Sequence, residues 1–160
     1  MDMQPSRPQA LCRAAGAGHV QNVLGVTHIY KALSAETANA FSLHEAIVPP
    51  GAGAPPHTHS REDESFYVLS GEVVVDLEGE SQPIRVGAGG FVYGPRGRRH
   101  AYRNASEREA RLLVIATPGA GLEAMFDAID AAGQAAKGMP PLDKLLAIAA
   151  QYGVAIQPPA

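Results

Sequence analysis

The chain has 160 residues, a length that suits a single domain with a real hydrophobic core. Its 13 Lys and Arg against 16 Asp and Glu give a net charge of −3, which argues against a surface for nucleic acid. Hydrophobic residues make up 46% of the sequence, but no stretch approaches the roughly 20 apolar residues of a membrane-spanning helix. A single cysteine, Cys12, excludes an intramolecular disulfide framework. We therefore expect a soluble protein that binds neither membranes nor nucleic acid.

The first 20 residues are predicted to form a flexible N-terminal arm. They contain Pro5 and Pro8 and a run of alanines and glycines, which disfavour regular structure. They lack the apolar core of a secretory signal, so we expect the protein to be cytoplasmic.

Residues 21–117 are predicted to be an all-β barrel. Short runs rich in Val, Ile, Tyr and Phe alternate with clusters of turn-forming residues, a spacing typical of a β-sandwich or barrel. About eight strands are expected, over residues 23–33, 41–48, 64–70, 72–77, 82–86, 91–93, 99–103 and 110–117. The proline- and glycine-rich run 49–56 is expected to be a loop.

The remaining residues, 118–160, are predicted to be a helical segment. Apolar residues recur at i, i+3, i+4 and i+7 over residues 122–129, which predicts an amphipathic helix that stops at Gly133. A second helix is expected over residues 141–153, because a proline begins it and a glycine ends it. We expect both helices to pack on the barrel or on a partner subunit.

Four side chains have a spacing that suits a metal site: His57, His59, Glu64 and His100. His57 and His59 are two residues apart, so they point the same way from a strand. Glu64 is an odd number of residues from His59, so residues 60–63 must contain a turn or bulge. His100 arrives from a different strand and completes the set.

This mixture of donors points to a functional metal centre. Imidazole suits Zn, Cu, Fe and Ni, whereas a carboxylate admits harder ions such as Mn. Four protein donors leave one or two positions of a five- or six-coordinate ion open. No cysteine lies among the candidate ligands, which disfavours a closed structural zinc site. We therefore expect one divalent ion, with Fe, Mn, Ni and Zn as open alternatives.

The residues around these ligands resemble the two signature motifs of the cupin superfamily. Residues 51–71 read G-x5-H-x-H-x4-E-x6-G, and residues 89–104 read G-x5-P-x-G-x2-H-x3-N. The resemblance implies a small jelly-roll barrel, or double-stranded β-helix, that holds a divalent metal ion with the same four side chains. The surrounding sequence, such as D-E-S-F-Y-V-L-S-G-E, is similar to the quercetin dioxygenase-like branch of small bacterial cupins. Cupins are commonly dimeric, so a homodimer is also implied.

Three further residues are predicted to contact a small-molecule substrate. Tyr102 shares the strand parity of His100, and Phe66 shares that of Glu64, so both should face the interior and line a pocket. Arg98 also shares the parity of His100 and is positioned to meet an anionic substrate at the mouth.

The remaining histidines and nearby acidic residues are predicted to lie outside the site. His19, His28 and His44 lack partners at ligand spacing, so surface exposure or core packing is expected. Glu62 and Asp63 are expected to be solvated loop charges.

The leading functional hypothesis, from the resemblance, is a metal-dependent dioxygenase that acts on a small aromatic or enol-type substrate. Glu64 would then be catalytic, as a proton acceptor. The first alternative is a non-redox isomerase, lyase or decarboxylase that uses the ion as a Lewis acid. The second is a module that binds or senses a small ligand without turnover.

Overall fold

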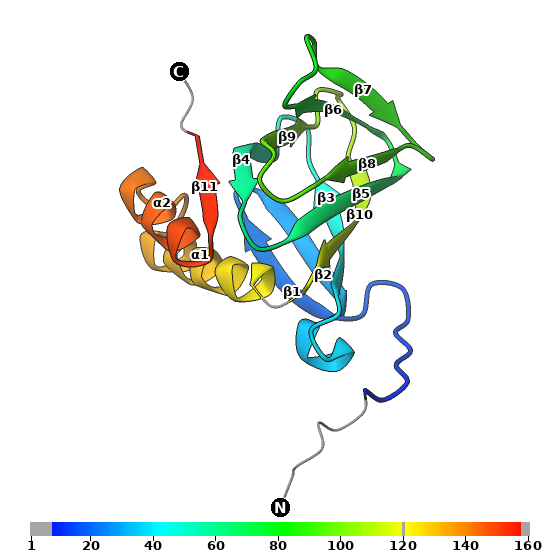
Figure 1. Cartoon of the computed structure of the whole chain (residues 1–160), viewed down its shortest axis with the longest axis vertical. Coiled ribbons are helices and arrows are strands. Elements are labelled where there is room, and N and C mark those ends of the chain that lie inside the picture. Colours follow the sequence, from blue (N-terminus) through cyan, green and yellow to red (C-terminus); the bar gives the residue numbers. More distant parts are fainter. Residues whose placement is uncertain (1–7, 120, 158–160) are drawn as a thin grey trace, which may run out of the picture.

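The protein forms a barrel of two facing β-sheets with two helices beside it (Figure 1). The computed structural model describes residues 8–119 and 121–157. The strands are β1 (His19–Val23), β2 (Val26–Ala32), β3 (Ser42–Val48), β4 (Gly53–His59), β5 (Asp63–Ser70), β6 (Glu72–Leu77), β7 (Ile84–Gly87), β8 (Phe91–Gly94), β9 (His100–Arg103), β10 (Ala110–Thr117) and β11 (Val154–Ile156). The helices are the short 3-10 helix η1 (Ser34–Thr37), α1 (Leu122–Ala136) and α2 (Leu142–Gln151).

The two sheets are entirely antiparallel in their pairings. The first sheet has the order β1-β2-β3-β10-β5-β8, and the second has the order β11-β4-β9-β6-β7. Side chains on β2, β3 and β10 alternate between buried and more exposed positions, as expected of strands with one face on a core. The barrel core is rich in valine, whose branched side chain suits a pleated surface. The all-β prediction is confirmed, with two C-terminal helices.

The proline-rich run that precedes His57 forms strand β4 from Gly53 onward. The prediction of a loop over residues 49–56 is therefore wrong for residues 53–56. Pro55 and Pro56 have no N–H to donate, but the pairing of β4 with β9 is interrupted between Ala54 and His57. The carbonyl of Pro56 still accepts a hydrogen bond from the backbone N–H of Gln157, at 2.8 Å. The prolines therefore occupy positions where the ladder does not need their donors.

The ends of the chain also differ from the predicted elements. β1 begins at His19, inside the predicted arm, and β11 follows the two helices as a strand of the second sheet. α1 continues through Gly133, the predicted stop, to Ala136. It ends there because Lys137 takes the left-handed conformation, with φ of 55°. The prediction that Gly133 ends the helix is wrong, because the C-cap residue is Lys137, four residues later.

The helices pack on one side of the barrel, where α1 lies along β1 and α2 lies beside β11 (Figure 1). Gln21 of β1 donates to the carbonyl of Glu123 at 3.0 Å and to the carboxylate of Asp127 at 2.6 Å. The backbone N–H of Asn22 donates to Asp130 at 3.1 Å. These bonds hold α1 against the barrel, whereas packing on a second subunit stays a prediction. Neither helix, within the described residues, has the length and apolar character needed to cross a membrane.

Two motif residues shape the barrel where its strands end. Gly71 turns the chain between β5 and β6 with φ of +75°, and a Cβ there would lie 2.8 Å from Cα of Ala110. Asn104 is fully buried, and its Nδ2 donates to the carbonyls of Val48 and Arg108 at 2.8 and 2.7 Å. These contacts satisfy buried backbone groups where the strands end.

Candidate metal centre

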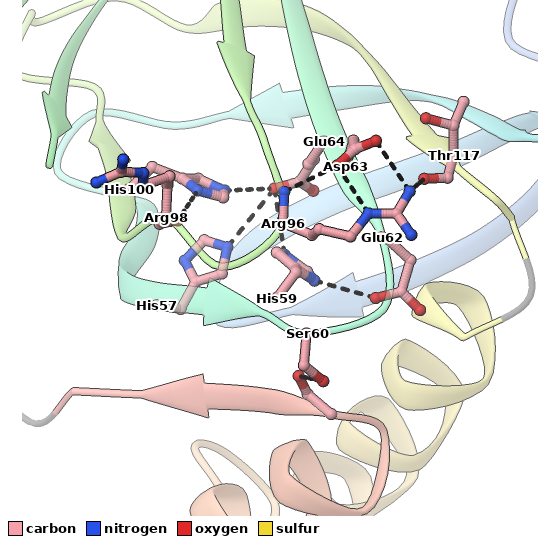
Figure 2. Close-up of polar contacts among 11 residues, drawn as sticks. His57, His59, Ser60, Glu62, Asp63, Glu64, Arg96, Arg98, His100 and Thr117 are labelled. Carbon is pink, nitrogen blue, oxygen red and sulfur yellow. Dashed lines mark hydrogen bonds and ion pairs between the residues drawn. The ribbon is translucent and has the colours of Figure 1, made fainter.

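Three strands bring the four predicted ligands together in the barrel interior (Figure 2). β4 carries His57 and His59, and β9 carries His100, which is the direct register partner of His57. Glu64 comes from β5 in the opposite sheet. Each of the four is at most 7% exposed. The cluster, as we call these four residues, therefore joins the two sheets.

The turn required by strand parity lies between β4 and β5, at residues 60–62. Ser60 anchors it, because its N–H and its hydroxyl both donate to the carbonyl of Gly153, at 2.9 and 2.8 Å. At the other end of the turn, Arg96 forms a bidentate ion pair with Asp63, with N–O distances of 3.0 and 2.9 Å. Hydrogen bonds from Arg96 lower the pKa of Asp63 to about 2. The predicted turn is confirmed, and Asp63 is paired rather than simply solvated.

Three imidazoles face one carboxylate oxygen, Oε2 of Glu64. The Nε2 atom of His100 is 3.1 Å from it, and those of His57 and His59 are each 3.5 Å from it. The candidate ligand atoms of the whole cluster lie within 4.8 Å of one another. Ligands around one ion with bonds of about 2.1 Å are at most about 4.2 Å apart. Shifts of a few tenths of an ångström would therefore close the cluster around an ion.

The opposite nitrogens of two imidazoles are anchored to the backbone. Nδ1 of His57 donates to the carbonyl of Pro55 at 2.7 Å, and Nδ1 of His100 donates to the carbonyl of Arg98 at 3.1 Å. A carbonyl only accepts, so these Nδ1 atoms carry the proton and Nε2 keeps its lone pair. The backbone thus fixes the tautomer that a metal ion needs.

The third imidazole, His59, faces a second carboxylate, that of Glu62. Oε2 of Glu62 is 3.5 Å from Nδ1 of His59, and Glu62 is only 2% exposed (Figure 2). Its other oxygen is packed against Gly121 at the start of α1, where any side chain would collide with it. The helix dipole favours a carboxylate in that place. The solvated-charge prediction for Glu62 is wrong, because α1 closes over the turn.

Burial and charge act in opposite directions on the pKa values of the cluster. Burial raises the pKa of Glu64, but the neighbouring imidazoles of His100, His57 and His59 outweigh it and hold the pKa well below its usual range. Burial also lowers the pKa of His59, but Glu62 and Glu64 raise it to about 9. The site therefore attracts positive charge into a buried space.

The residues fit a divalent cation. Both ring nitrogens of His59 are buried and have no hydrogen-bond partner among the described residues, since their carboxylate neighbours are 3.5 Å away. An ion at Nε2, with Glu62 at Nδ1, would satisfy this ring in the carboxylate–histidine–metal arrangement. Three imidazoles and a carboxylate suit Fe, Mn, Ni and Zn, so the donor set leaves the identity of the ion open.

The cluster opens on a mainly apolar cavity. Phe66 and Tyr102 both lie in its wall, with ring centroids 5.3 Å apart. Arg98 does not lie in that wall, because it precedes β9 and its side chain is 65% exposed and paired with Glu78 at 3.2 Å. The structure therefore places two of the three predicted substrate residues at the cavity and one outside it.

Two histidines that the sequence assigned to surface or packing roles, His28 and His44, line the same cavity. They project from β2 and β3 and are 4% and 1% exposed. Phe126 of α1 covers them, with its ring centroid 4.5 Å from that of His28 and 5.9 Å from that of His44. Their spacing in the sequence does not predict that the two residues meet, because they come together only through the pairing of β2 with β3. Strand parity alone would have turned both inward.

The fold and the cluster together define a class of protein: a two-sheet jelly-roll barrel with a buried centre of three histidines and one glutamate. Residues 44–116 match the family described as the cupin domain. This part of the chain is therefore similar to a cupin domain, and the jelly-roll prediction is confirmed. The quercetin dioxygenase-like branch stays a prediction.

The similar proteins include two from Streptomyces. Polyketide synthase CurC of Streptomyces cyaneus is 37% identical over 73 residues, 46% of this chain and 46% of its own. Protein SchB of Streptomyces halstedii is 37% identical over 88 residues, 54% of this chain and 62% of its own. The chain thus covers less than two thirds of each. A solved structure of an oxalate oxidase is 26% identical, with a TM-score of 0.53, and the match covers 64% of this chain and 56% of that chain.

Proposed function

We propose that this protein is a metal-dependent enzyme that uses dioxygen to oxidise a small, neutral, planar substrate of the aromatic or enol type. The cluster would hold one divalent ion, which supplies Lewis-acid and electron-transfer chemistry when bound. The observation that carries the proposal is the opening of a buried three-histidine, one-glutamate cluster onto an apolar cavity. The motif resemblance to quercetin dioxygenase-like cupins and the likeness to an oxidase support the choice of reaction.

The cavity wall favours a neutral substrate. No Lys or Arg is among the described residues that line it. Oxalate, for which the similar oxidase is named, would bring two negative charges into this apolar space at a high desolvation cost. Phe66, Tyr102 and Phe126 instead offer ring surfaces to a planar, uncharged ligand.

The cavity itself is small, so one wall has to move for an aromatic ring to enter. It encloses about 60 Å³, which is room for only a few water molecules. Helix α1 supplies Leu122, Met125, Phe126 and Ile129 to the wall. Phe126 is only half-buried, so an outward rotation of its ring opens the space beneath it. Substrate size is therefore set by this helix.

Two residues of the wall are suited to proton handling. Glu64 is ionised and buried, so an enol or phenol hydroxyl that enters the cavity meets a proton acceptor. Burial raises the pKa of Tyr102, so its phenol keeps its proton and can donate a hydrogen bond to a substrate oxygen.

A non-redox reaction on the same substrate class is the second candidate. The relative named a polyketide synthase favours it. Polyketide chains contain 1,3-dicarbonyl units, and a Lewis acid stabilises their enolates without net oxidation. Isomerisation, cyclisation, or cleavage of a carbon–carbon bond would then replace oxidation.

Oxygen uptake separates the two candidates. Protein loaded in turn with Fe(II), Mn(II), Ni(II) and Zn(II) is mixed in air with a flavonol and with a 1,3-diketone, and product and oxygen are both followed. We expect oxygen uptake with at least one redox-active ion and none with zinc, which has no redox chemistry. Full product formation with zinc would show that the reaction is the non-redox one. Thermal stabilisation by the ligands without any product would leave only a binding role.

A further inference from the structure

His28 and His44 form a second polar group in the cavity wall, separate from the cluster. Their rings meet edge to face with centroids 4.8 Å apart. Tyr30, the next inward-facing residue on β2, lies against His44 with centroids 4.9 Å apart. All three side chains are buried.

The polar atoms of this group have no partners within the described part of the chain. Nδ1 of His28, Nδ1 of His44 and the hydroxyl of Tyr30 are all buried without a hydrogen bond. Nearly all buried polar groups in folded proteins are paired, and an unpaired one destabilises the fold. Apolar side chains would fill the same space without that cost. Packing alone therefore does not account for two imidazoles here, whereas an oxygen atom of a ligand would satisfy them.

The strand register separates this pair from the cluster by a short, defined span. His44 pairs with Val114 of β10, and Val114 pairs with Phe66 of β5, two residues after Glu64. Two interstrand spacings put the backbones of His44 and Phe66 roughly 10 Å apart. His28, His44 and Glu64 nevertheless line one cavity. A ligand that contacts both groups therefore needs two separated oxygens.

Both imidazoles are uncharged at neutral pH. Burial, together with the neighbouring His44, holds the pKa of His28 well below its usual range, and burial lowers the pKa of His44 to about 4. A neutral imidazole offers one donor and one acceptor. The pair therefore matches a carbonyl or hydroxyl oxygen better than a carboxylate.

We propose that His28 and His44 form a second polar subsite that hydrogen-bonds a carbonyl or hydroxyl oxygen of a neutral substrate, whose other oxygen faces the cluster. The inference rests on the proposed function, because that places a substrate in this cavity. It adds the requirement that the substrate carries two separated oxygens. Phe126 covers both imidazoles, so the subsite is shielded from solvent before a substrate enters.

Two probes that differ by one oxygen test the subsite: 2-naphthol and naphthalene-2,6-diol. Their Kd values are measured by calorimetry on the zinc-loaded full chain, as the natural protein and as His28→Leu, His44→Leu and His44→Gln. We expect the natural protein to bind the diol about tenfold more tightly, the effect of one buried hydrogen bond. Both leucine variants should bring the ratio close to one and leave the Kd of 2-naphthol within about threefold. His44→Gln should restore part of the ratio, because its amide donates and accepts.

The exposed His19 supplies the matched control, and His19→Leu should keep the natural ratio. A ratio that is the same in the natural protein and both leucine variants overturns the subsite. Failure of the proposed function gives a different result: the probes then bind equally well with and without zinc, whatever the ratio between them.

Thermal unfolding gives a second measurement that needs no ligand. If the imidazoles serve a substrate, His28→Leu and His44→Leu remove unpaired polar groups, so the Tm should stay the same or rise. A structural role predicts the opposite. A fall of more than about 5 °C in both variants, at pH 7.5 and with zinc bound, overturns the proposal.

Discussion

His57 of β4 and His100 of β9 are direct partners in the antiparallel ladder, and their ring centroids lie 4.4 Å apart. One comes from each of the two sequence motifs, so this pairing brings the two motifs together at the candidate metal centre. Their Nδ1 atoms are both held by backbone carbonyls two residues earlier in the chain. The site is therefore built from strand geometry before any ion binds.

Removal of one of these imidazoles should empty the site. In His100→Ala we expect the metal content to fall to about a tenth or less of that of the natural protein, because only two imidazoles and one carboxylate remain as donors. Elemental analysis of protein purified without added metal or chelator measures this. His19→Ala, which removes an exposed imidazole, should keep the full content. Stoichiometric metal in His100→Ala would rule out the four-ligand site.

Glu62 should tune the ion through His59 without touching it. Glu62→Gln keeps the shape but removes the charge that orients the His59 ring, so we expect metal affinity to fall by about 10- to 100-fold. Competition with a chromogenic chelator gives the affinity. The matched control is Glu80→Gln, at an exposed turn, which should leave the affinity unchanged. An unchanged affinity in Glu62→Gln would mean that the carboxylate only packs against α1.

Two strand glycines offer a steric test of the position of His100. A Cβ on Gly94 would lie 2.9 Å from Cε1 and Nδ1 of the His100 ring, whereas a Cβ on Gly87 would meet nothing within 4 Å. Neither glycine has a left-handed φ, so backbone strain does not separate the two variants. We expect Gly94→Ala to lower metal affinity about tenfold and Gly87→Ala to leave it intact. Equal affinities would show that the ring has room to move.

The ligand set could be predicted because its information is local. His57 and His59 share a strand face, Glu64 requires one turn, and fixed motif spacings supply His100. Glu62 could not be predicted in the same way. Its burial depends on α1, which begins about sixty residues later and closes over the turn.

Contacts between distant segments also explain why the role of His28 was not predicted and why the run before His57 was incorrectly predicted to be a loop. His28 becomes part of the cavity only through the alignment of β2 with β3 and the cover of Phe126. The prolines of β4 read as chain breakers, yet they fall where the ladder to β9 is interrupted. In each case a tertiary partner decided the role, and that partner lies far away in the sequence.

Acid should destabilise the fold through His44. Burial lowers its pKa to about 4, against an ordinary 6.5 in the unfolded chain. Between these values the unfolded chain binds a proton that the folded protein does not, so the free energy of unfolding falls as the pH falls from 6.5 to 4. The loss attributable to His44 approaches about 3 kcal/mol near pH 4.

Urea unfolding of the metal-free protein between pH 4.5 and 7.5 measures this dependence. His44→Gln should flatten the slope, while His19→Gln, at an exposed position, should retain it. Three other titratable groups act on His44: His28, Tyr30 and Glu64. The comparison between the two glutamine variants removes their shared contribution, because both variants keep all three. If the free energy of unfolding has the same pH dependence in His44→Gln and in the natural protein, His44 takes up its proton equally easily in the folded and unfolded states. That result would contradict the prediction.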